Sequence, residues 1–199
     1  MHTEETLSWT DLFRCLLFLV MICIFSDADA LCSEKPPLLF GATVSGDGRY
    51  EAPSRMVKSG YRLWEKQVNE RGGILGRPVR VILYNDKSRP DLARTLCEKL
   101  IREDEVDFVL SPYGTPLTMA ASEVTERHGY VMLASAASGD RIWERGFSYV
   151  FGMYALARRY FIGTLDMMAR QGYQNVAFLH DATSSFNVDA VNGGRNWAD

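Results

Sequence analysis

The chain has 199 residues, of which 47% are hydrophobic and 24% are charged, with 16 glycines and 7 prolines. This composition is typical of one or two globular domains, and it excludes a disordered chain, a collagen-like chain and a disulfide scaffold. The formal net charge is −3, and the residues after position 30 carry 21 basic against 20 acidic side chains. A body so close to neutral lacks the positive field that backbone-driven nucleic-acid binding requires, so we expect no nucleic-acid partner.

Residues 1–30 have the features of a secretory signal peptide. Residues 15–25 (CLLFLVMICIF) form an unbroken apolar run, which is shorter than the roughly 20 residues that a helix needs to span a bilayer. Ala28-Asp29-Ala30 then matches an A-x-A cleavage pattern. We therefore expect a signal peptide over residues 1–30, a linker over 31–37, and export to the periplasm or another extracytoplasmic compartment. Membrane attachment through a lipid-modified Cys32 is an alternative, although Leu31 is bulky for such a signal.

From residue 38 onward the sequence alternates between strand-like and helix-like patterns. Short apolar runs predict strands over residues 38–44, 78–84, 106–110, 130–133, 149–151 and 176–179. Apolar residues three and four positions apart predict helices between them: one from Pro53 to the Gly72-Gly73 pair, one after Pro90, one starting at Thr115-Pro116, and a long one over 155–170. Ser88-Arg89-Pro90-Asp91 has the form of a capping box for the second helix. This alternation predicts a parallel sheet covered by helices on both faces.

In a parallel sheet, ligands collect at the carboxyl ends of the strands, where three loops meet here: residues 45–50, 111–115 and 134–139. The second loop leads directly into a helix, whose unpaired first amides and positive dipole end favour a carboxylate. Thr115 is either a ligand-binding hydroxyl at this end or simply an N-cap. Gly114 allows close approach to the main chain. In the third loop, the small residues Ala136, Ala137 and Ser138 leave backbone groups accessible.

Motifs for catalysis and metal binding are missing from the sequence. Gly46-Asp47-Gly48 begins like a dinucleotide fingerprint, but Glu51 stands where the third glycine should be. There is no phosphate loop of the form G-x-x-x-x-G-K-[ST] and no G-x-S-x-G elbow. His128 and His180 have no Cys or carboxylate at metal-like spacing, and Cys97 lies on the apolar stripe of a predicted helix. We expect no catalytic residue, metal or cofactor.

Two segments of the chain resemble the type I periplasmic solute-binding proteins, in particular the leucine/isoleucine/valine-binding branch that serves ABC importers. Residues 69–78 (NERGGILGRP) are similar to the "IN..GGILGRP" turn of that family, and residues 84–90 (YNDKSRP) to its "..DD.S.P" element. The resemblance implies a flavodoxin-like α/β fold in two similar lobes. This chain would supply a complete N-terminal lobe over residues 38–150 and an incomplete second lobe over 151–199. It is then either a fragment or a truncated gene product.

The resemblance also implies a ligand site. Thr115 and Ser138 would offer hydroxyls and amides, and Ala136 a backbone carbonyl or amide. Phe186 stands where the family usually has a Tyr after an "HD" or "YD" pair, here His180-Asp181, so a polar contact is lost at this position. The expected ligand-binding residues are Tyr50, Tyr113, Gly114, Thr115, Ala136, Ala137, Ser138 and Phe186.

The implied function is non-catalytic capture of an amino acid or a similar small solute between two lobes, for delivery to the permease subunits of an ABC importer. Hinge closure would follow from the contact of the ligand with both lobes. Two alternatives stay open. One is a ligand-sensing domain of a receptor or regulator with the same fold. The other, less favoured, is an α/β enzyme, which fits the alternating pattern but lacks every catalytic motif sought above.

Overall fold

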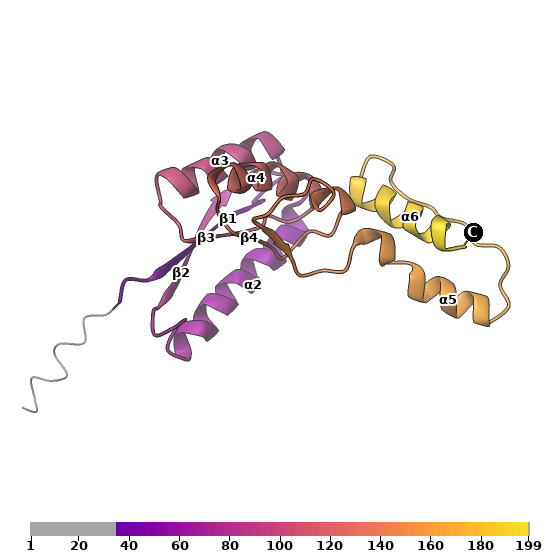
Figure 1. Ribbon diagram of the computed structural model, residues 1–199, viewed down its shortest axis with the longest axis horizontal. Helices are drawn as coiled ribbons and strands as arrows, with labels where there is room; N and C mark the ends of the chain where they lie inside the picture. The colour runs from indigo at the N-terminus through magenta and orange to yellow at the C-terminus, as the bar shows by residue number, and fades with distance from the viewer. Residues whose placement is uncertain (1–34, 199) are drawn as a thin grey trace, which may run out of the picture. The chain divides into compact units, whose positions relative to one another are not determined.

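A computed structural model describes residues 35–198, and residues 37–199 form one compact unit (Figure 1). The predicted signal peptide, Cys32 and most of the predicted linker lie outside the described residues. The unit is built on a five-stranded parallel sheet with the order β2-β1-β3-β4-β5. Its strands are β1 (Leu38–Val44), β2 (Val79–Asn85), β3 (Phe108–Leu110), β4 (Met132–Ala134) and β5 (Val150–Gly152). Its helices are α2 (Glu51–Glu70), α3 (Pro90–Arg102), α4 (Thr115–His128), α5 (Ile162–Arg170) and α6 (Ser185–Ala198).

Helices cover both faces of the sheet, as the alternating pattern predicts. On one face α2 packs Tyr61, Val57 and Trp64 against the apolar side chains of β1 and β2. On the other face α3 and α4 pack Leu100 and Val124 against β3 and β4. Figure 1 shows α2 on one side of the strands and α3 with α4 on the other. Cys97 is a buried free thiol in the second of these cores, as its place on the apolar stripe predicts.

The predicted capping box at residues 88–91 is wrong. The N-cap residue of α3 is Arg89, and no side chain within residues 35–198 caps this helix. The Ser88 hydroxyl instead donates to the Asp47 carbonyl at 2.7 Å and accepts from the Tyr50 amide at 3.0 Å. The hydroxyl of Ser88 is therefore used to hold the loop after β1, which is distant in sequence.

Two elements predicted beyond residue 151 differ from the structure. Only Ile162–Arg170 of the predicted helix 155–170 is α-helical, and it is preceded by the 3₁₀ helix Ala157–Arg159. The Ala157 amide donates to the Ser138 carbonyl at 2.8 Å, so this part of the chain follows the loop after β4 instead of continuing a helix. Residues 176–179 form no strand, because no described strand lies beside them to pair their backbone groups.

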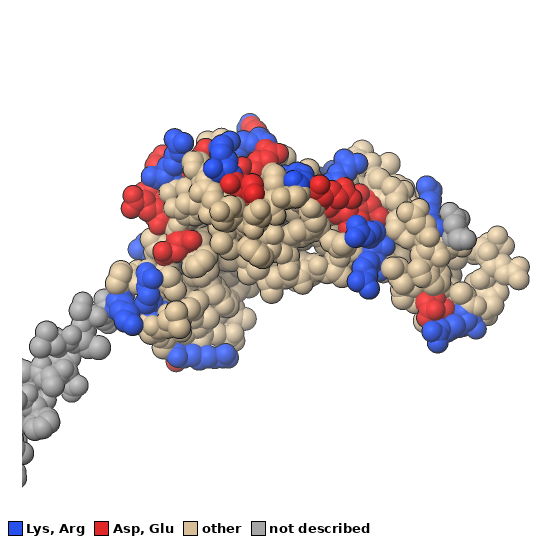
Figure 2. All heavy atoms as spheres, viewed as in Figure 1, with Lys and Arg blue, Asp and Glu red and all other residues tan. Residues whose placement is uncertain are grey.

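The charged surface of the described residues is mixed in sign. Figure 2 shows basic and acidic side chains interspersed over α3 and α4, with a broad uncharged area below them. Arg94 and Glu123 form one of these pairs, with 2.6 Å between the guanidinium and the carboxylate. Within residues 35–198 no helix has both the length and the hydropathy needed to cross a membrane.

Candidate functional site

Three loops at the carboxyl edge of the sheet surround one cavity. They follow β1, β3 and β4, which are neighbours in the sheet. The chain leaves β1 toward β2 on one side and returns to β3 on the other, so the strand order reverses between β1 and β3. Such a reversal is where open α/β sheets leave a crevice for ligands. The three loops are those in which the sequence predicts ligand contacts.

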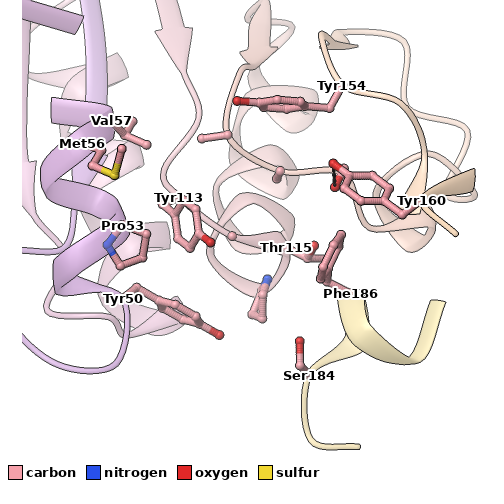
Figure 3. A pocket seen from close by; sticks show the side chains of 15 residues that line it. Tyr50, Pro53, Met56, Val57, Tyr113, Thr115, Tyr154, Tyr160, Ser184 and Phe186 are labelled. Carbon is pink, nitrogen blue, oxygen red and sulfur yellow. Dashed lines mark hydrogen bonds between the residues drawn. The ribbon is translucent and has the colours of Figure 1, made fainter. Parts of the chain in front are cut away.

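The loop after β1 places Tyr50 at the start of α2. The backbone of this loop is held by the Ser88 hydroxyl described above and by Asn85, whose side-chain oxygen accepts from the Gly46 amide at 2.7 Å. The Tyr50 ring then lies near the Tyr113 ring of the next loop, with 6.0 Å between their centroids. Both rings stand on the α2 side of the cavity (Figure 3).

The loop after β3 leads into α4 through Gly114, which is the N-cap residue. Thr115 is the first residue of the helix, so the alternative that Thr115 is an N-cap is wrong. Gly114 has φ +90°, a conformation that L side chains rarely adopt, and its amide donates to the Ala136 carbonyl at 2.9 Å. Pro116 has no amide hydrogen, so Thr115 and Leu117 supply the first amides of α4, which have no partner within a helix.

The loop after β4 is held against the other two by hydrogen bonds. The Ala136 amide donates to the Ser111 hydroxyl at 3.2 Å, and the Gly139 amide donates to Thr115 Oγ1 at the same distance. The Ala136 amide therefore serves the protein itself, and the Ala136 carbonyl, which already accepts from the Gly114 amide, has a second lone pair open to a ligand donor. A side chain at Gly139 would overlap Thr115, so the two loops touch closely here.

A buried tyrosine anchors these loops from below. The Tyr61 hydroxyl of α2 donates to the Ser111 carbonyl at 2.6 Å and lies 2.6 Å from the Ser135 hydroxyl. Burial raises the pKa of Tyr61 to about 12, and its two hydrogen bonds only partly oppose this effect. The phenol is thus neutral at ordinary pH and fixes the carboxyl ends of two neighbouring strands to α2.

The cavity encloses about 500 Å³ and has mostly aromatic and small residues in its walls. From the far side, Tyr160 and Phe186 face the tyrosines of the first two loops, with their own rings edge to face at a centroid distance of 5.2 Å. Figure 3 shows these two pairs on opposite sides of the space, with Thr115 between them. The full lining is Tyr50, Pro53, Met56, Val57, Tyr113, Gly114, Thr115, Pro116, Ala136, Ala137, Ser138, Tyr154, Tyr160, Ser184 and Phe186.

Two hydroxyls at this cavity have hydrogens left to donate. Thr115 Oγ1 accepts from the Gly139 amide, and Ser138 Oγ accepts from the Tyr160 hydroxyl at 3.1 Å. Because each oxygen accepts from the protein, its own hydrogen is available for a second partner. Two hydroxyl donors beside the amino end of a helix form a surface that suits a carboxylate oxygen.

All eight ligand-binding residues that the sequence predicts line this cavity. Sequence reasoning missed Met56 and Val57 of α2 and the tyrosines Tyr154 and Tyr160. Tyr154 follows β5, so the rule that selected the other loops also applies to it. The sequence carries no comparable signal for Met56 and Val57. Apolar residues on a helix can face the core, a cavity or solvent, and their spacing alone does not tell these apart.

The other polar residues singled out in the sequence lie outside the cavity lining. His128 ends α4 and lies 2.6 Å from the Glu98 carboxylate, and Asp181 pairs with Arg49 at 2.6 Å. Hydrogen bonds from Thr183 hold the pKa of Asp181 below its usual range. Over residues 35–198 no group of three or more His, Cys, Asp or Glu side chains is arranged to hold a metal ion.

The family follows from comparison with known sequences. A family model described as "Periplasmic binding protein" matches residues 38–199. The chain belongs to this family. It is 26% identical over 133 residues to the leucine-specific-binding protein of Salmonella typhimurium, which covers 63% of this chain and 34% of that protein. It is also 26% identical over 83 residues to the Leu/Ile/Val-binding protein of Escherichia coli K12, covering 42% of this chain and 22% of that protein. It thus spans about a third or less of these two relatives.

Solved structures of substrate-binding proteins of transporters share the fold. The branched-chain amino acid transporter substrate-binding protein LivJ of Streptococcus pneumoniae, in complex with isoleucine, matches 80% of this chain and 46% of its own with a TM-score of 0.72 at 20% identity. A solute-binding protein of an ABC transporter from Rhodopseudomonas palustris BisB5, in complex with 3,4-dihydroxybenzoic acid, matches 82% of this chain and 44% of its own with a TM-score of 0.73 at 22% identity. The predicted α/β fold is thereby confirmed.

Proposed function

We propose that this chain is the ligand-binding part of an extracytoplasmic, non-catalytic periplasmic binding protein that captures a small carboxylate solute for an ABC importer. Amino acids are the solutes named for the two curated relatives, and a dihydroxybenzoic acid is bound by one structural neighbour. These ligands share a carboxylate. The observation that carries the proposal is the pair of hydroxyl hydrogens on Thr115 and Ser138 at the amino end of α4.

The proposal assigns the cavity residues distinct roles. Thr115 and Ser138 donate to the carboxylate, with the first amides of α4 adding a partial positive charge. Tyr50, Tyr113 and Phe186 cover the body of the solute and exclude water from it. The described residues that line the cavity supply donors and apolar walls but no nucleophile paired with a base, so the cavity is suited to holding a solute without transforming it.

Titration calorimetry with solutes and their amides tests this function. We expect leucine or benzoate to bind, and leucinamide and benzamide to bind at least about tenfold more weakly, because an amide lacks the negative charge that the donors favour. Thr115→Ala and Ser138→Ala are each expected to weaken binding of the carboxylate by about tenfold. Equal affinity for carboxylates and amides would contradict the proposal.

Thr95→Ala is the matched control for Thr115→Ala. Thr95 is an exposed threonine of α3 whose hydroxyl donates to the Asp91 carbonyl within its own helix, and it does not line the cavity. We expect this variant to bind the carboxylate as the unchanged protein does. A Thr115→Ser variant keeps the hydroxyl and should retain most of the affinity, which separates loss of the donor from general disturbance of the loop.

A further inference from the structure

Aromatic rings stand on both sides of the cavity. Tyr50 and Tyr113 stand on the side of α2, and Tyr160 and Phe186 stand opposite them, with Tyr154 also among the lining residues (Figure 3). The two rings within each pair are inclined, at 56° for Tyr50 with Tyr113 and at 85° for Tyr160 with Phe186. Inclined rings on two sides offer both faces and edges to a third ring between them, which is the arrangement that aromatic pairs prefer.

No charged side chain is among those that line the cavity in the described part of the chain. The acidic residues close in sequence to lining residues lie beside basic side chains, although Asp140 Oδ1 is buried and has no hydrogen-bond partner within residues 35–198. Glu51 pairs with Arg55 at 2.6 Å, and Asp140 lies 3.8 Å from Arg158. An α-ammonium group bound here would lose its water without gaining a carboxylate partner, which is unfavourable. The donors on Thr115 and Ser138 serve only the carboxylate end of a solute.

Hydroxyls are also present away from the carboxylate subsite. Tyr160 donates to Ser138, but no hydrogen bond of the hydroxyls of Tyr50, Tyr113 and Tyr154 is found among residues 35–198. Figure 3 shows the Tyr50 and Tyr113 hydroxyls directed from their rings into the space between the two aromatic pairs. They can therefore meet a polar substituent on the body of the solute without any charge being required there.

We propose that the solute is an aromatic carboxylate without an ammonium group. This inference rests on the proposed function, and it narrows the class of solute at the same cavity. The carboxylate is bound at the amino end of α4 by Thr115 and Ser138, and the ring lies between Tyr50 with Tyr113 and Tyr160 with Phe186. Aliphatic amino acids have neither the ring that these walls suit nor a carboxylate partner for their ammonium group among the described lining residues.

Three probes of similar size separate the two parts of this inference. They are 3-phenylpropanoate, phenylalanine, which adds an α-ammonium group, and 3-cyclohexylpropanoate, which replaces the aromatic ring by a saturated one. Dissociation constants come from saturation-transfer NMR titrations of the 199-residue protein, with leucine as a fourth ligand. We expect 3-phenylpropanoate to bind at least about tenfold more tightly than each of the other three.

Each other result has a definite meaning. Equal or tighter binding of phenylalanine or leucine overturns the inference and leaves the proposed function standing; tighter binding of phenylalanine would show that the rings hold its ammonium group. Equal binding of 3-cyclohexylpropanoate overturns the aromatic part. Absence of binding by all four carboxylates overturns the proposed function and this inference together.

Variants of Tyr113 locate the effect in the cavity wall. Tyr113→Leu is expected to remove most of the preference for 3-phenylpropanoate over 3-cyclohexylpropanoate, whereas Tyr113→Phe keeps the ring and should keep the preference. Tyr173→Leu is the control, because Tyr173 is an exposed tyrosine that does not line this cavity. An unchanged preference in Tyr113→Leu, with the fold intact by circular dichroism, would contradict the assignment of the ring subsite.

Discussion

Single residues decide how closely the loops of this chain approach one another. Gly73 has φ +79°, and a Cβ atom there would overlap the carbonyl oxygen of Arg77 in the turn before β2. Gly60 lies on the exposed face of α2, and no atom of the described residues lies within 4 Å of the position of a Cβ there. The two glycines thus have opposite roles, one required by the backbone and one unfavourable in a helix.

Alanine at these two positions is expected to change stability in opposite directions. Gly73→Ala should lower the free energy of unfolding by about 2 kcal/mol or more, because the left-handed conformation and the overlap both disfavour a side chain. Gly60→Ala should raise it by about 0.5–1 kcal/mol, since alanine is the better helix former. Urea denaturation of both variants measures the change, and a stabilised Gly73→Ala would contradict the described turn.

The buried phenol of Tyr61 makes stability depend on alkaline pH. Its pKa in the folded protein is about 12, against a usual value of 10.0, so folding favours the neutral form. This contribution is fully present below pH 10 and is lost as pH rises from 10 to 12, by roughly 2 to 3 kcal/mol in all. Burial likewise raises the pKa of the Cys97 thiol to about 12 from a usual value of 9.0. The stability that the neutral thiol contributes is therefore lost as pH rises from 9 to 12.

Denaturation of the unchanged protein and of Tyr61→Phe at several pH values between 8 and 12 checks this prediction. Tyr61→Phe should be less stable at pH 8, because it loses the hydrogen bonds to Ser111 and Ser135. It should also lose stability less steeply above pH 10. For Cys97→Ala, the free energy of unfolding should fall less steeply with pH from pH 9 upward. Parallel curves for Tyr61→Phe and the unchanged protein would show that the phenol does not titrate as described.

At the scale of elements, the strands were the most predictable part of the chain. The apolar run at 38–44 coincides with β1, and the strands predicted up to residue 151 lie within two residues of those in the structure at each end. Their signal is local, because a strand buried on both faces needs apolar residues throughout. The capping box failed because the choice of partner for the Ser88 hydroxyl depends on Asp47 and Tyr50, which fold against it from 38 or more residues away.

The predicted strand at residues 176–179 marks the limit of local reasoning. Its apolar residues are typical of a strand, but a strand forms only where a neighbouring strand pairs with its backbone. Leu179 is fully exposed here, and Val176 is also exposed. The sequence pattern therefore indicates what the segment would do beside another strand, while the structure describes it without one.

Hydrogen exchange followed by NMR distinguishes these two kinds of segment. We expect the backbone amides of residues 174–179 to exchange at least about 100-fold faster than those of β1, whose bonds to β2 and β3 are in the centre of the sheet. The amides of α5 should lie between these extremes. Slow exchange over 174–179 would mean that these residues are paired in solution, for example with another copy of the chain.

At the scale of the whole compact unit, the site combines parts that are far apart in sequence. Tyr50 and Phe186 line the same cavity, and Arg49, next to Tyr50, pairs with Asp181, five residues before Phe186. The sequence identifies the loops because strand ends fix where loops must lie, and the resemblance supplied Phe186. The sequence does not show which hydroxyls can still donate a hydrogen bond to a ligand. That depends on the tertiary structure, in which Thr115 accepts from the Gly139 amide and Ser138 accepts from the Tyr160 hydroxyl.

The central claim is that the amino end of α4, with Thr115 and Ser138, receives the carboxylate of a small solute. The most direct measurement is the change in backbone amide chemical shifts of the 199-residue protein as 3-phenylpropanoate or leucine is added. The account predicts that the largest shifts fall on Thr115, Leu117 and Ser138, with small shifts along α3. Shifts concentrated elsewhere, such as a second cavity lined by Ser54 and Lys58 of α2 and Tyr84 of β2, or no shifts with either ligand, would contradict it.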